Sequence, residues 1–245
     1  MDKEQRNLLR ASQNHARQVN GLSFSSPVAF VYNPLVYANE PHRLYLTKFG
    51  TGKKHVVFLG MNPGPWGMAQ TGVPFGEVSF VRDWLKIEGT INHPQNEHPK
   101  RPVQGFECTR SEVSGRRLWS LLRDRFRTPE AFFRDHFIAN YCPLLFMEES
   151  GKNLTPDKIQ AAERNPLLRC CDNYLRQVIE ILDPEWVVGI GLFAKKRIDG
   201  VLSDRGVRGK IRRTASILHP SPASPMANRG WAEQATKKLE ELGIW

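Results

Sequence analysis

The feature that most constrains this chain is a long connection rich in glycine and proline, GMNPGPWGMAQTGVPFGE, at residues 60–77. It follows the apolar run His55–Leu59, which is typical of a buried strand, and it precedes Val78–Ile87, where helical spacing of bulky and charged residues predicts a helix. Five glycines and three prolines stand in it. A connection this long inside an α/β unit is usually functional, although a rigid structural loop is the alternative.

The side chains of this connection favour a binding pocket over an ordinary surface loop. Ligand pockets have apolar walls with a few fixed polar groups, whereas surface loops are rich in Ser, Asp, Lys and Glu. This connection carries apolar and uncharged polar side chains, namely Met61, Trp66, Met68, Val73, Phe75, Asn62, Gln70 and Thr71.

Strand and helix signals alternate along the chain. Further apolar runs predict strands at residues 136–140, 186–190 and 214–218. Helical periodicity is found over residues 3–18, 41–49, 114–126, from Pro129, over 155–182 with an interruption near Pro166, from Leu192, and over 232–242. Residues 26–38 receive no assignment. The alternation predicts an α/β fold with a central, mostly parallel sheet and helices on both faces.

We expect a single domain over residues 1–245, with residues 1–40 as a helical extension packed on it. In parallel sheets, ligands bind beyond the carboxyl ends of the strands. Asn62, Asn140 and His219 each follow a predicted strand. Three polar groups from distant parts of the chain should therefore meet at one edge of the sheet.

The charge of the chain favours a polyanionic partner. The net charge is +10. Much of the excess falls in one basic segment, residues 195–213, as Lys195, Lys196, Arg197, Arg205, Arg208, Lys210, Arg212 and Arg213. A solvated basic face is the alternative to nucleic-acid binding.

Other classes of protein are disfavoured by composition. No run approaches the roughly 20 apolar residues of a membrane helix, and the N-terminus has no apolar core of a secretory signal. The four cysteines form no C-x-x-C pair, which suits a reducing compartment, and the scattered histidines predict no metal. Gly189–Ala194 matches a dinucleotide fingerprint, but the expected acidic ribose ligand is replaced by Lys210, Arg212 and Arg213. Its glycines more readily serve close strand–helix packing or the approach of a phosphate.

Several long motifs resemble the single-strand-selective monofunctional uracil-DNA glycosylases, a family within the uracil-DNA glycosylase superfamily. They occur in the order of that family, from about residue 40 to the C-terminus, as GMNPGP (60–65), GMAQTGVPFGE (67–77), SEVSG (111–115), NYCPLL (140–145), HPSP (219–222) and ANRGW (227–231). The resemblance implies a hydrolytic DNA glycosylase that removes uracil and C5-modified uracils such as 5-hydroxymethyluracil from single- and double-stranded DNA, without a cofactor.

The resemblance also assigns roles to residues. Phe75 would stack on the flipped base, Asn140 would read it, Asn62 would position the water, and His219, neutral or protonated, would stabilise the leaving base. Met61 would help to bind the base through its backbone. Gly64 stands where other members of the superfamily carry a tyrosine, which implies room for a C5 substituent.

Contacts to DNA are implied for three further groups. The first comprises Ser111 and Ser114, the second the basic Lys195, Lys196 and Arg197, and the third the insertion loop with Pro220, Ser221, Pro222, Ala223, Met226 and Arg229. Ala223 stands where the family often has arginine, and Trp66 where phenylalanine is common, so activity on duplex DNA stays open. We expect a monomer, in the nucleus of a eukaryote or in the nucleoid-containing cytoplasm of a bacterium. The alternatives are a superfamily glycosylase with a shifted base preference, a non-catalytic nucleic-acid-binding module and an NADP-dependent enzyme.

Overall fold

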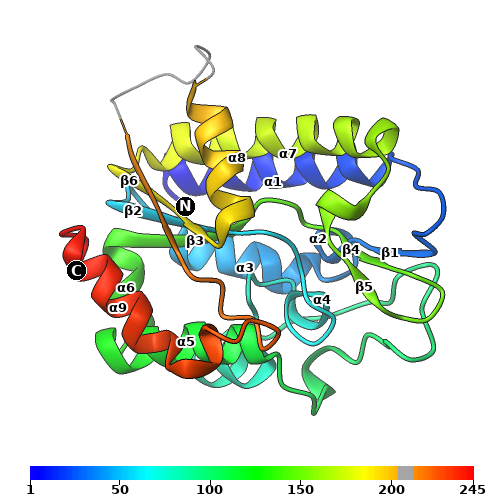
Figure 1. The fold of residues 1–245 in the computed structure, drawn as a ribbon, viewed down its shortest axis with the longest axis horizontal. Coiled ribbons are helices and arrows are strands. Elements are labelled where there is room, and N and C mark those ends of the chain that lie inside the picture. Colours follow the sequence, from blue (N-terminus) through cyan, green and yellow to red (C-terminus); the bar gives the residue numbers. More distant parts are fainter. Residues whose placement is uncertain (204–211) are drawn as a thin grey trace.

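A four-stranded parallel sheet lies at the centre of the computed structural model, which describes residues 1–203 and 212–245 (Figure 1). The strand order is β3–β2–β6–β7, with bounds β2 (Val56–Gly60), β3 (His136–Asn140), β6 (Trp186–Ile190) and β7 (Arg213–Ile217). All three pairings are parallel, and Gly60 lies opposite Asn140 in the register of β2 and β3. The carboxyl ends of the four strands therefore share one edge.

Every residue of β2, β3 and β6 is buried, which explains why these strands appear in the sequence as unbroken apolar runs. One face of the sheet is covered by α1 (Lys3–Asn20), α7 (Ala161–Leu182) and α8 (Leu192–Ser203), and the other by α5 (Val113–Phe126), α6 (Pro129–Asp135) and α9 (Trp231–Glu241) (Figure 1). The predicted parallel sheet with helices on both faces is confirmed.

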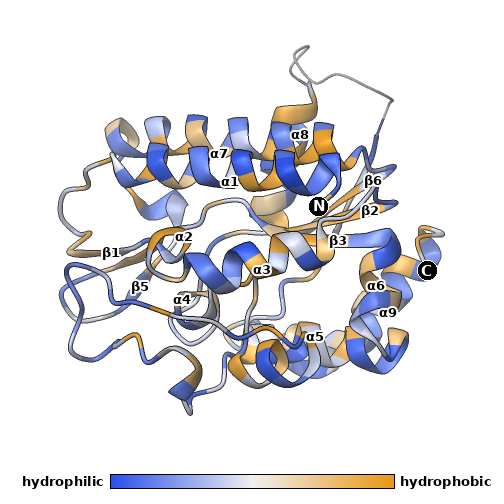
Figure 2. Cartoon of the chain, turned by 180° about the vertical axis from the view of Figure 1, so that it is seen from behind, coloured by the Kyte–Doolittle hydropathy of each residue, from blue (hydrophilic) through white to orange (hydrophobic). Residues whose placement is uncertain are grey.

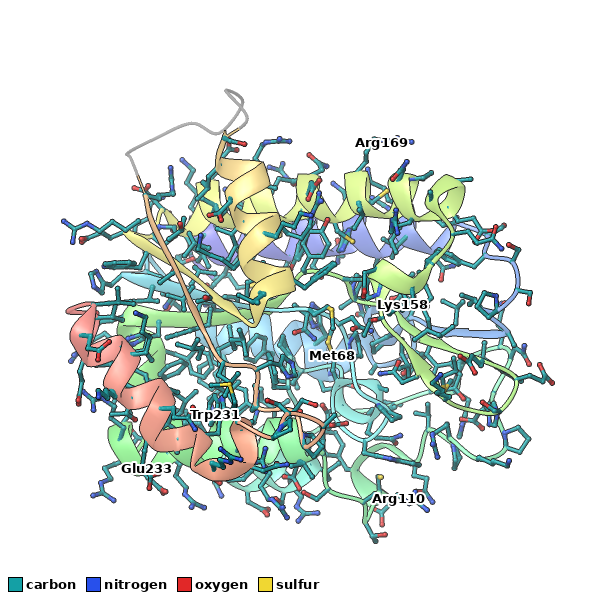
Figure 3. All side chains as sticks on the ribbon, viewed as in Figure 1. Met68, Arg110, Lys158, Arg169, Trp231 and Glu233 are labelled. Atoms are coloured by element: carbon teal, nitrogen blue, oxygen red, sulfur yellow. The ribbon has the colours of Figure 1, made fainter. Side chains whose placement is uncertain are left out.

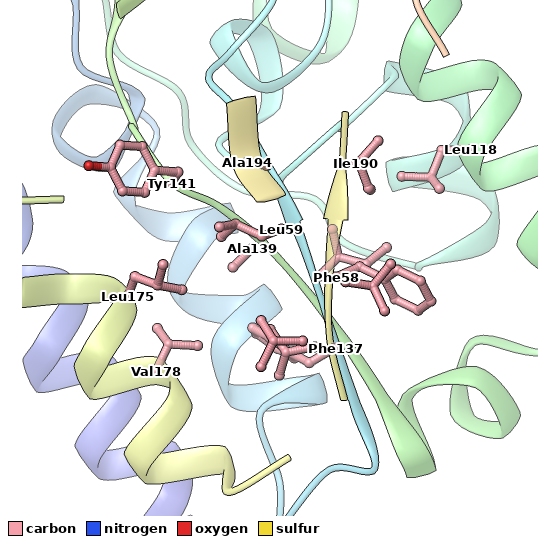
Figure 4. Close-up of a cluster of buried hydrophobic side chains, with 14 of the residues drawn as sticks. Phe58, Leu59, Leu118, Phe137, Ala139, Tyr141, Leu175, Val178, Ile190 and Ala194 are labelled. Carbon is pink, nitrogen blue, oxygen red and sulfur yellow. The ribbon is translucent and has the colours of Figure 1, made fainter. Parts of the chain in front are cut away.

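The two apolar layers are visible on either side of the strands. Leu118 of α5 lies beside Ile190 on one face, whereas Leu175 and Val178 of α7 lie near Leu59 on the other (Figure 4). The helices turn their hydrophilic residues outward, as Figure 2 shows for α1 and α7.

The N-terminal helix α1 is set by its cap and its apolar stripe. Asp2 accepts from the Gln5 amide and the Gln5 side chain accepts from the Asp2 amide, which forms a capping box. Leu8 and Val19 are buried, and the helix packs along α7 and against α3 (Asn39–Phe49). The sequence-based boundary at residue 18 differs from the observed end by two residues.

The predicted interruption near Pro166 is wrong. Helix α7 begins at Ala161 and continues through Pro166. The proline lies in the second turn, where it removes one backbone hydrogen bond, while the apolar face of the helix stays buried against α1 and the sheet. Burial of that face outweighs the single lost bond.

The helix predicted over Val78–Ile87 is shorter than expected. Helical residues run from 78 to 84 and include a π-helical turn, Phe80–Trp84, closed by a hydrogen bond from the Leu85 amide to the Phe80 carbonyl at 2.8 Å. Lys86 adopts a φ of 53°, a left-handed conformation that a continuing helix does not allow.

A second, antiparallel sheet escaped prediction because its strands are very short. Its order is β1–β4–β5, with bounds β1 (Phe30–Tyr32), β4 (Leu145–Met147) and β5 (Asn153–Leu154). The remaining short elements are α2 (Pro34–Tyr37), α4 (Met68–Thr71) and the 3₁₀ turns Gly105–Glu107, Pro156–Lys158 and Ala227–Arg229. The basic residues Arg205, Arg208 and Lys210 lie outside the described residues. None of the described helices has the length and apolar character needed to span a membrane.

Candidate active-site pocket

A pocket of about 440 Å³ opens at the carboxyl edge of the central sheet. Its walls include all six residues predicted to bind or act on a substrate, together with three of the predicted DNA contacts. These nine are Met61, Asn62, Gly64, Phe75, Asn140, His219, Ser114, Ser221 and Pro222. The pocket also contains Pro63, Pro65, Met68, Glu112, Asn153 and Thr155. Segments far apart in the sequence thus meet as the parallel topology requires.

Gly60, the last residue of β2, lets two of these side chains meet. A Cβ at this position would lie 2.3 Å from Asn140 Oδ1 and 2.4 Å from Phe75 Cε2. Real Cβ atoms do not approach other atoms so closely, so only glycine allows the amide and the ring to sit side by side over the end of the strand.

The backbone of Phe75 is held in an uncommon conformation. Its φ is 54°, in the left-handed region that a bulky residue rarely adopts. The Phe75 carbonyl accepts from the Trp119 indole at 2.9 Å and from the Glu77 amide at 2.7 Å. A Cβ at Gly115 would lie 2.1 Å from this carbonyl. The surrounding groups therefore hold a strained residue that presents its ring to the pocket, a pattern found at functional sites.

The orientation of the Asn140 amide follows from its neighbour. Asn140 Nδ2 lies 3.2 Å from the sulfur of Met68. A thioether accepts weakly and cannot donate, so the NH₂ group faces it and the oxygen faces away. Asn140 Oδ1 is buried and has no hydrogen-bond partner among residues 1–203 and 212–245. A buried acceptor without a partner is costly, and a ligand with an N–H donor would satisfy it.

Asn62 is fixed through one end of its amide. Its Nδ2 donates to the Leu144 carbonyl at 3.3 Å, next to β4, and to the Pro63 carbonyl at 3.5 Å. The carbonyl oxygen is then the end available to accept from a water molecule. An amide does not titrate usefully, so Asn62 can orient a water but cannot act as a general base.

His219 follows β7 and faces the pocket from the opposite wall. Its ring centroid lies 6.2 Å from that of Phe75, and its Cβ would lie 3.2 Å from a Cβ built at Gly191, whose φ is 94°. Burial lowers the pKa of His219 below its usual value. A lowered pKa favours the neutral ring at pH 7, one of the two protonation states that the sequence left open.

Two polar residues of the long connection do not line the pocket. Gln70 and Thr71 are fully buried within the connection itself. The Gln70 side chain donates to the carbonyls of Pro65 and Pro102 and accepts from the amides of Gln104 and Gly105. The sequence grouped both residues with Asn62, but their side chains hold the connection in shape, and of the three only Asn62 faces the pocket.

Glu112 is an ionisable pocket residue to which the sequence assigned no role. It directly precedes α5, yet its carboxylate does not cap that helix. It turns instead toward the long connection, where Oε2 accepts from the Trp66 amide at 3.3 Å. Burial raises the pKa of the Glu112 carboxyl above its usual value. Because the motif around it is polar, no feature of the sequence separated this carboxylate from a solvated one.

The insertion loop is anchored to α5 by an arginine that was also missed. Arg117 donates to the carbonyls of Pro220 at 3.2 Å and Ser221 at 3.4 Å, and to Asn228 Oδ1 at 2.8 Å. Beyond this anchor, Ala223 and Arg229 are exposed, and Met226 has an exposed fraction of 61%. The loop therefore presents an apolar side chain to solvent near the pocket mouth.

The predicted basic contacts on α8 lie away from the pocket walls and are unequal. Arg197 forms an ion pair with Asp172 and lies over the ring of Tyr141, with 5.5 Å from its guanidinium carbon to the ring centroid. Lys195 pairs with Asp199 at 2.5 Å. Lys196 is exposed, and the described part of the chain offers it no ion-pair partner. Of the two serines, Ser114 lines the pocket, whereas Ser111 Oγ is buried and none of the described residues gives it a hydrogen bond.

The fingerprint at Gly189–Ala194 has a structural explanation. A Cβ at Gly189 would lie 2.5 Å from the Lys195 amide nitrogen, so glycine allows α8 to approach β6 closely. Among residues 1–203 and 212–245, no group of three or more His, Cys, Asp or Glu side chains could hold a metal ion.

Trp66, on the long connection, has two arginines close to its ring. The guanidinium carbons of Arg110 and Arg101 are 4.5 Å and 5.4 Å from its ring. Arg110 is exposed on an outer loop, as Figure 3 shows. The sequence predicted basic DNA contacts only on α8. Arg101 and Arg110 add positive charge at a second place, on the loops near Trp66 and Glu112.

Comparison with known proteins agrees with this arrangement. Residues 47–241 match the model of the uracil DNA glycosylase superfamily. The single-strand selective monofunctional uracil-DNA glycosylase of Rattus norvegicus is 50% identical over 227 residues, which cover 93% of this chain and 81% of the rat protein. The Bos taurus protein of the same name is 49% identical, with 93% and 82% covered. The crystal structure of wild-type Pedobacter heparinus SMUG2 shares the fold, with a TM-score of 0.65 at 16% identity over 96% of this chain and 99% of that one.

Proposed function

The chain belongs to the uracil-DNA glycosylase superfamily and, within it, to the single-strand-selective monofunctional family. On this premise we propose that it hydrolyses the N-glycosidic bond of uracil and of C5-modified uracils such as 5-hydroxymethyluracil. The substrate is single- or double-stranded DNA, and the reaction initiates base excision repair. The similar proteins of rat and cattle carry names that state this activity on uracil in DNA.

The observation that carries the proposal is the buried Oδ1 of Asn140, close to the ring of Phe75, for which the described residues offer no hydrogen-bond partner. A flipped uracil stacked on Phe75 offers N3–H to this oxygen and O4 to the Nδ2 group. Cytosine has an acceptor at N3 and a donor at C4, so it would leave both ends of the amide unpaired. Sites that hydrogen-bond their substrate discriminate in this way by roughly 10⁴–10⁵-fold.

The chemistry proceeds by departure of the base and capture of the sugar by water. As the glycosidic bond lengthens, positive charge develops on the sugar and negative charge on the base. Neutral His219 donates a hydrogen bond to O2 and stabilises the developing anion. Asn62 holds the water that attacks the sugar cation, which needs orientation more than it needs a strong base. None of the described residues lining the pocket is a lysine, in keeping with hydrolysis and no Schiff base.

Extrusion of the base leaves a gap in the stack that the insertion loop can fill. Met226 is the exposed apolar side chain of that loop, and Arg117 holds the loop in place. Apolar wedges of this kind separate neighbouring base pairs. Because Ala223 is small, Met226 and the prolines carry this task, and activity on a paired uracil depends on them.

The test is strand scission by hot alkali on labelled oligonucleotides. Each carries one uracil, 5-hydroxymethyluracil, thymine or cytosine, single-stranded or paired. Alkali-dependent scission at uracil and 5-hydroxymethyluracil alone is the expected result. Scission without alkali would contradict the absence of lyase activity. Scission at a different base would favour a glycosylase with shifted preference, and none at all would favour a non-catalytic binding module.

A further inference from the structure

The space beside Gly64 is not empty. A Cβ built on Gly64 would lie 2.2 Å from Glu112 Oε2, 2.7 Å from Cδ and 3.1 Å from Oε1. A Cβ on Gly67 would lie 2.9 Å from Glu112 Cγ. The volume that a side chain at position 64 would fill is therefore occupied by a carboxyl group from another segment of the chain.

This carboxyl group is held toward the pocket. Its Oε2 accepts from the Trp66 amide, and the side chain leaves the amides of α5 without a side-chain cap. Glu112 lines the pocket together with Gly64 and Pro65. One carboxyl oxygen thus fixes the long connection, while the other has no hydrogen-bond partner among the described residues.

The position of this wall relative to the base follows from the proposed function, on which the inference rests. A uracil stacked on Phe75 with N3 at Asn140 and O2 toward His219 has N1 attached to the sugar at the pocket mouth. The C5 edge then faces the side of the pocket that neither Asn140 nor His219 occupies. Gly64, Pro65 and Glu112 line the pocket and have no contact with the base in the arrangement proposed so far, so we place them at the C5 edge.

We propose that Glu112 determines specificity at C5, accepting a hydrogen bond from the hydroxyl group of 5-hydroxymethyluracil and disfavouring the methyl group of thymine. A hydroxyl donor satisfies the free carboxyl oxygen. A methyl group in the same place would strip that oxygen of water and return no hydrogen bond. Uracil, with hydrogen at C5, leaves room for a water molecule between the base and the carboxyl. Burial, which raises the pKa of Glu112, agrees with a group set in a largely enclosed wall.

Two variants separate this role from a purely structural one. Glu112→Ala removes the acceptor and opens the wall. Glu112→Gln keeps the length of the side chain and an oxygen that accepts from the Trp66 amide, and it places an NH₂ group where the free carboxyl oxygen was. A substrate hydroxyl can accept from that NH₂ group, whereas a methyl group cannot. We would measure kcat/KM on single-stranded oligonucleotides containing uracil, 5-hydroxymethyluracil or thymine, for the wild type and both variants, with thermal unfolding as a check on folding.

For Glu112→Ala we expect the ratio of 5-hydroxymethyluracil to uracil excision to fall roughly tenfold, while thymine excision becomes measurable. Glu112→Gln should keep the ratio near that of the wild type. Equal losses on uracil and 5-hydroxymethyluracil, with no gain on thymine, would overturn the inference and leave Glu112 as a support for the Trp66 loop. A wild type that removes no uracil would contradict the proposed function itself. A wild type that removes uracil but not 5-hydroxymethyluracil would overturn the inference while the uracil activity stands.

Discussion

The pocket edge of the sheet and the basic helix α8 differ in how far their polar and charged side chains are already bound within the protein. The sequence marked both as places that contact DNA. At the pocket edge, neighbours hold the polar groups but leave hydrogen-bonding capacity free. Within the described part of the chain, Asn140 Oδ1 has no partner, and the hydrogen bonds of the Asn62 side chain are made by its Nδ2. On α8, the charges of Arg197 and Lys195 are already neutralised by Asp172 and Asp199. A group kept unsatisfied by a rigid frame is available to a ligand, whereas a paired charge mainly serves the fold.

The largest effect should come from removing the incomplete acceptor. Asn140→Ala is expected to lower kcat/KM for uracil by roughly 10³-fold or more, because both hydrogen bonds to the base are lost in a water-poor pocket. Steady-state kinetics on single-stranded DNA measure this. Retention of wild-type activity would show that Asn140 does not read the base.

Asn62 tests whether the two amides of the pocket differ in role. Asn62→Ala should lower kcat by roughly 10²–10³-fold while changing the dissociation constant for uracil-containing DNA little, because the water is needed only in the reaction. Single-turnover rates and equilibrium binding are measured on the same preparation. Equal losses in both quantities would remove the water-positioning role.

The pH profile tests the charge state at the pocket. Burial lowers the pKa of His219 below 6.5, so the ring is neutral above that pH and gains a proton only as the pH falls through the lowered value. If the neutral ring is the active form, activity is full at pH 7 and its acid limb lies below pH 6.5. The pH at the midpoint of the acid limb, measured by kinetics, should agree with the pKa of His219 measured by NMR titration. Loss of activity as the pH rises through the pKa of His219 would instead indicate that the protonated ring is required.

Buried histidines predict a parallel loss of stability in acid. Burial lowers the pKa of His15 to about 3 and that of His42 to about 4. The unfolded chain binds these protons near pH 6.5 and the folded chain only near pH 3–4, so stability is full above pH 6.5 and declines as the pH falls. Each histidine contributes about 1.4 kcal/mol per pH unit across that window. Urea unfolding between pH 7 and pH 4.5 measures the slope, and a His15→Phe variant with an unchanged slope would contradict the assignment.

The smallest effects are expected for two adjacent residues of α8, Lys196 and Arg197, whose substitution should change different properties. Lys196→Ala is expected to weaken DNA binding a few-fold and to reduce the salt dependence by about one ion, because Lys196 is exposed and has no ion-pair partner in the described part of the chain. Arg197→Ala should leave affinity nearly unchanged but lower stability by about 1–2 kcal/mol, through the lost ion pair and ring contact. Fluorescence anisotropy at several salt concentrations and thermal unfolding measure the two effects. The opposite assignment of effects would show that α8 meets DNA through Arg197.

Sequence reasoning located the parts of the fold that depend on strong local patterns. Val56–Gly60, His136–Asn140 and Trp186–Ile190 are buried on both faces, so their apolar runs could be recognised without any knowledge of neighbours. The strands Leu145–Met147 and Asn153–Leu154 are too short to show a period, and they exist because they pair with each other. Pro166 misled the prediction because its local cost is smaller than the burial of the helix face that contains it.

By itself, the sequence determined the parallel sheet, the long connection after β2 and the residue types that meet beyond the strand ends. These follow from local spacing and from a topology that brings the carboxyl ends of parallel strands to one edge. Only the tertiary structure decided which groups are left free there. It placed Glu112 beside Gly64, fixed the amide of Asn140 against Met68 and paired Arg197 with Asp172. Whether a side chain is satisfied depends on atoms distant in the sequence, and no local pattern carries that information.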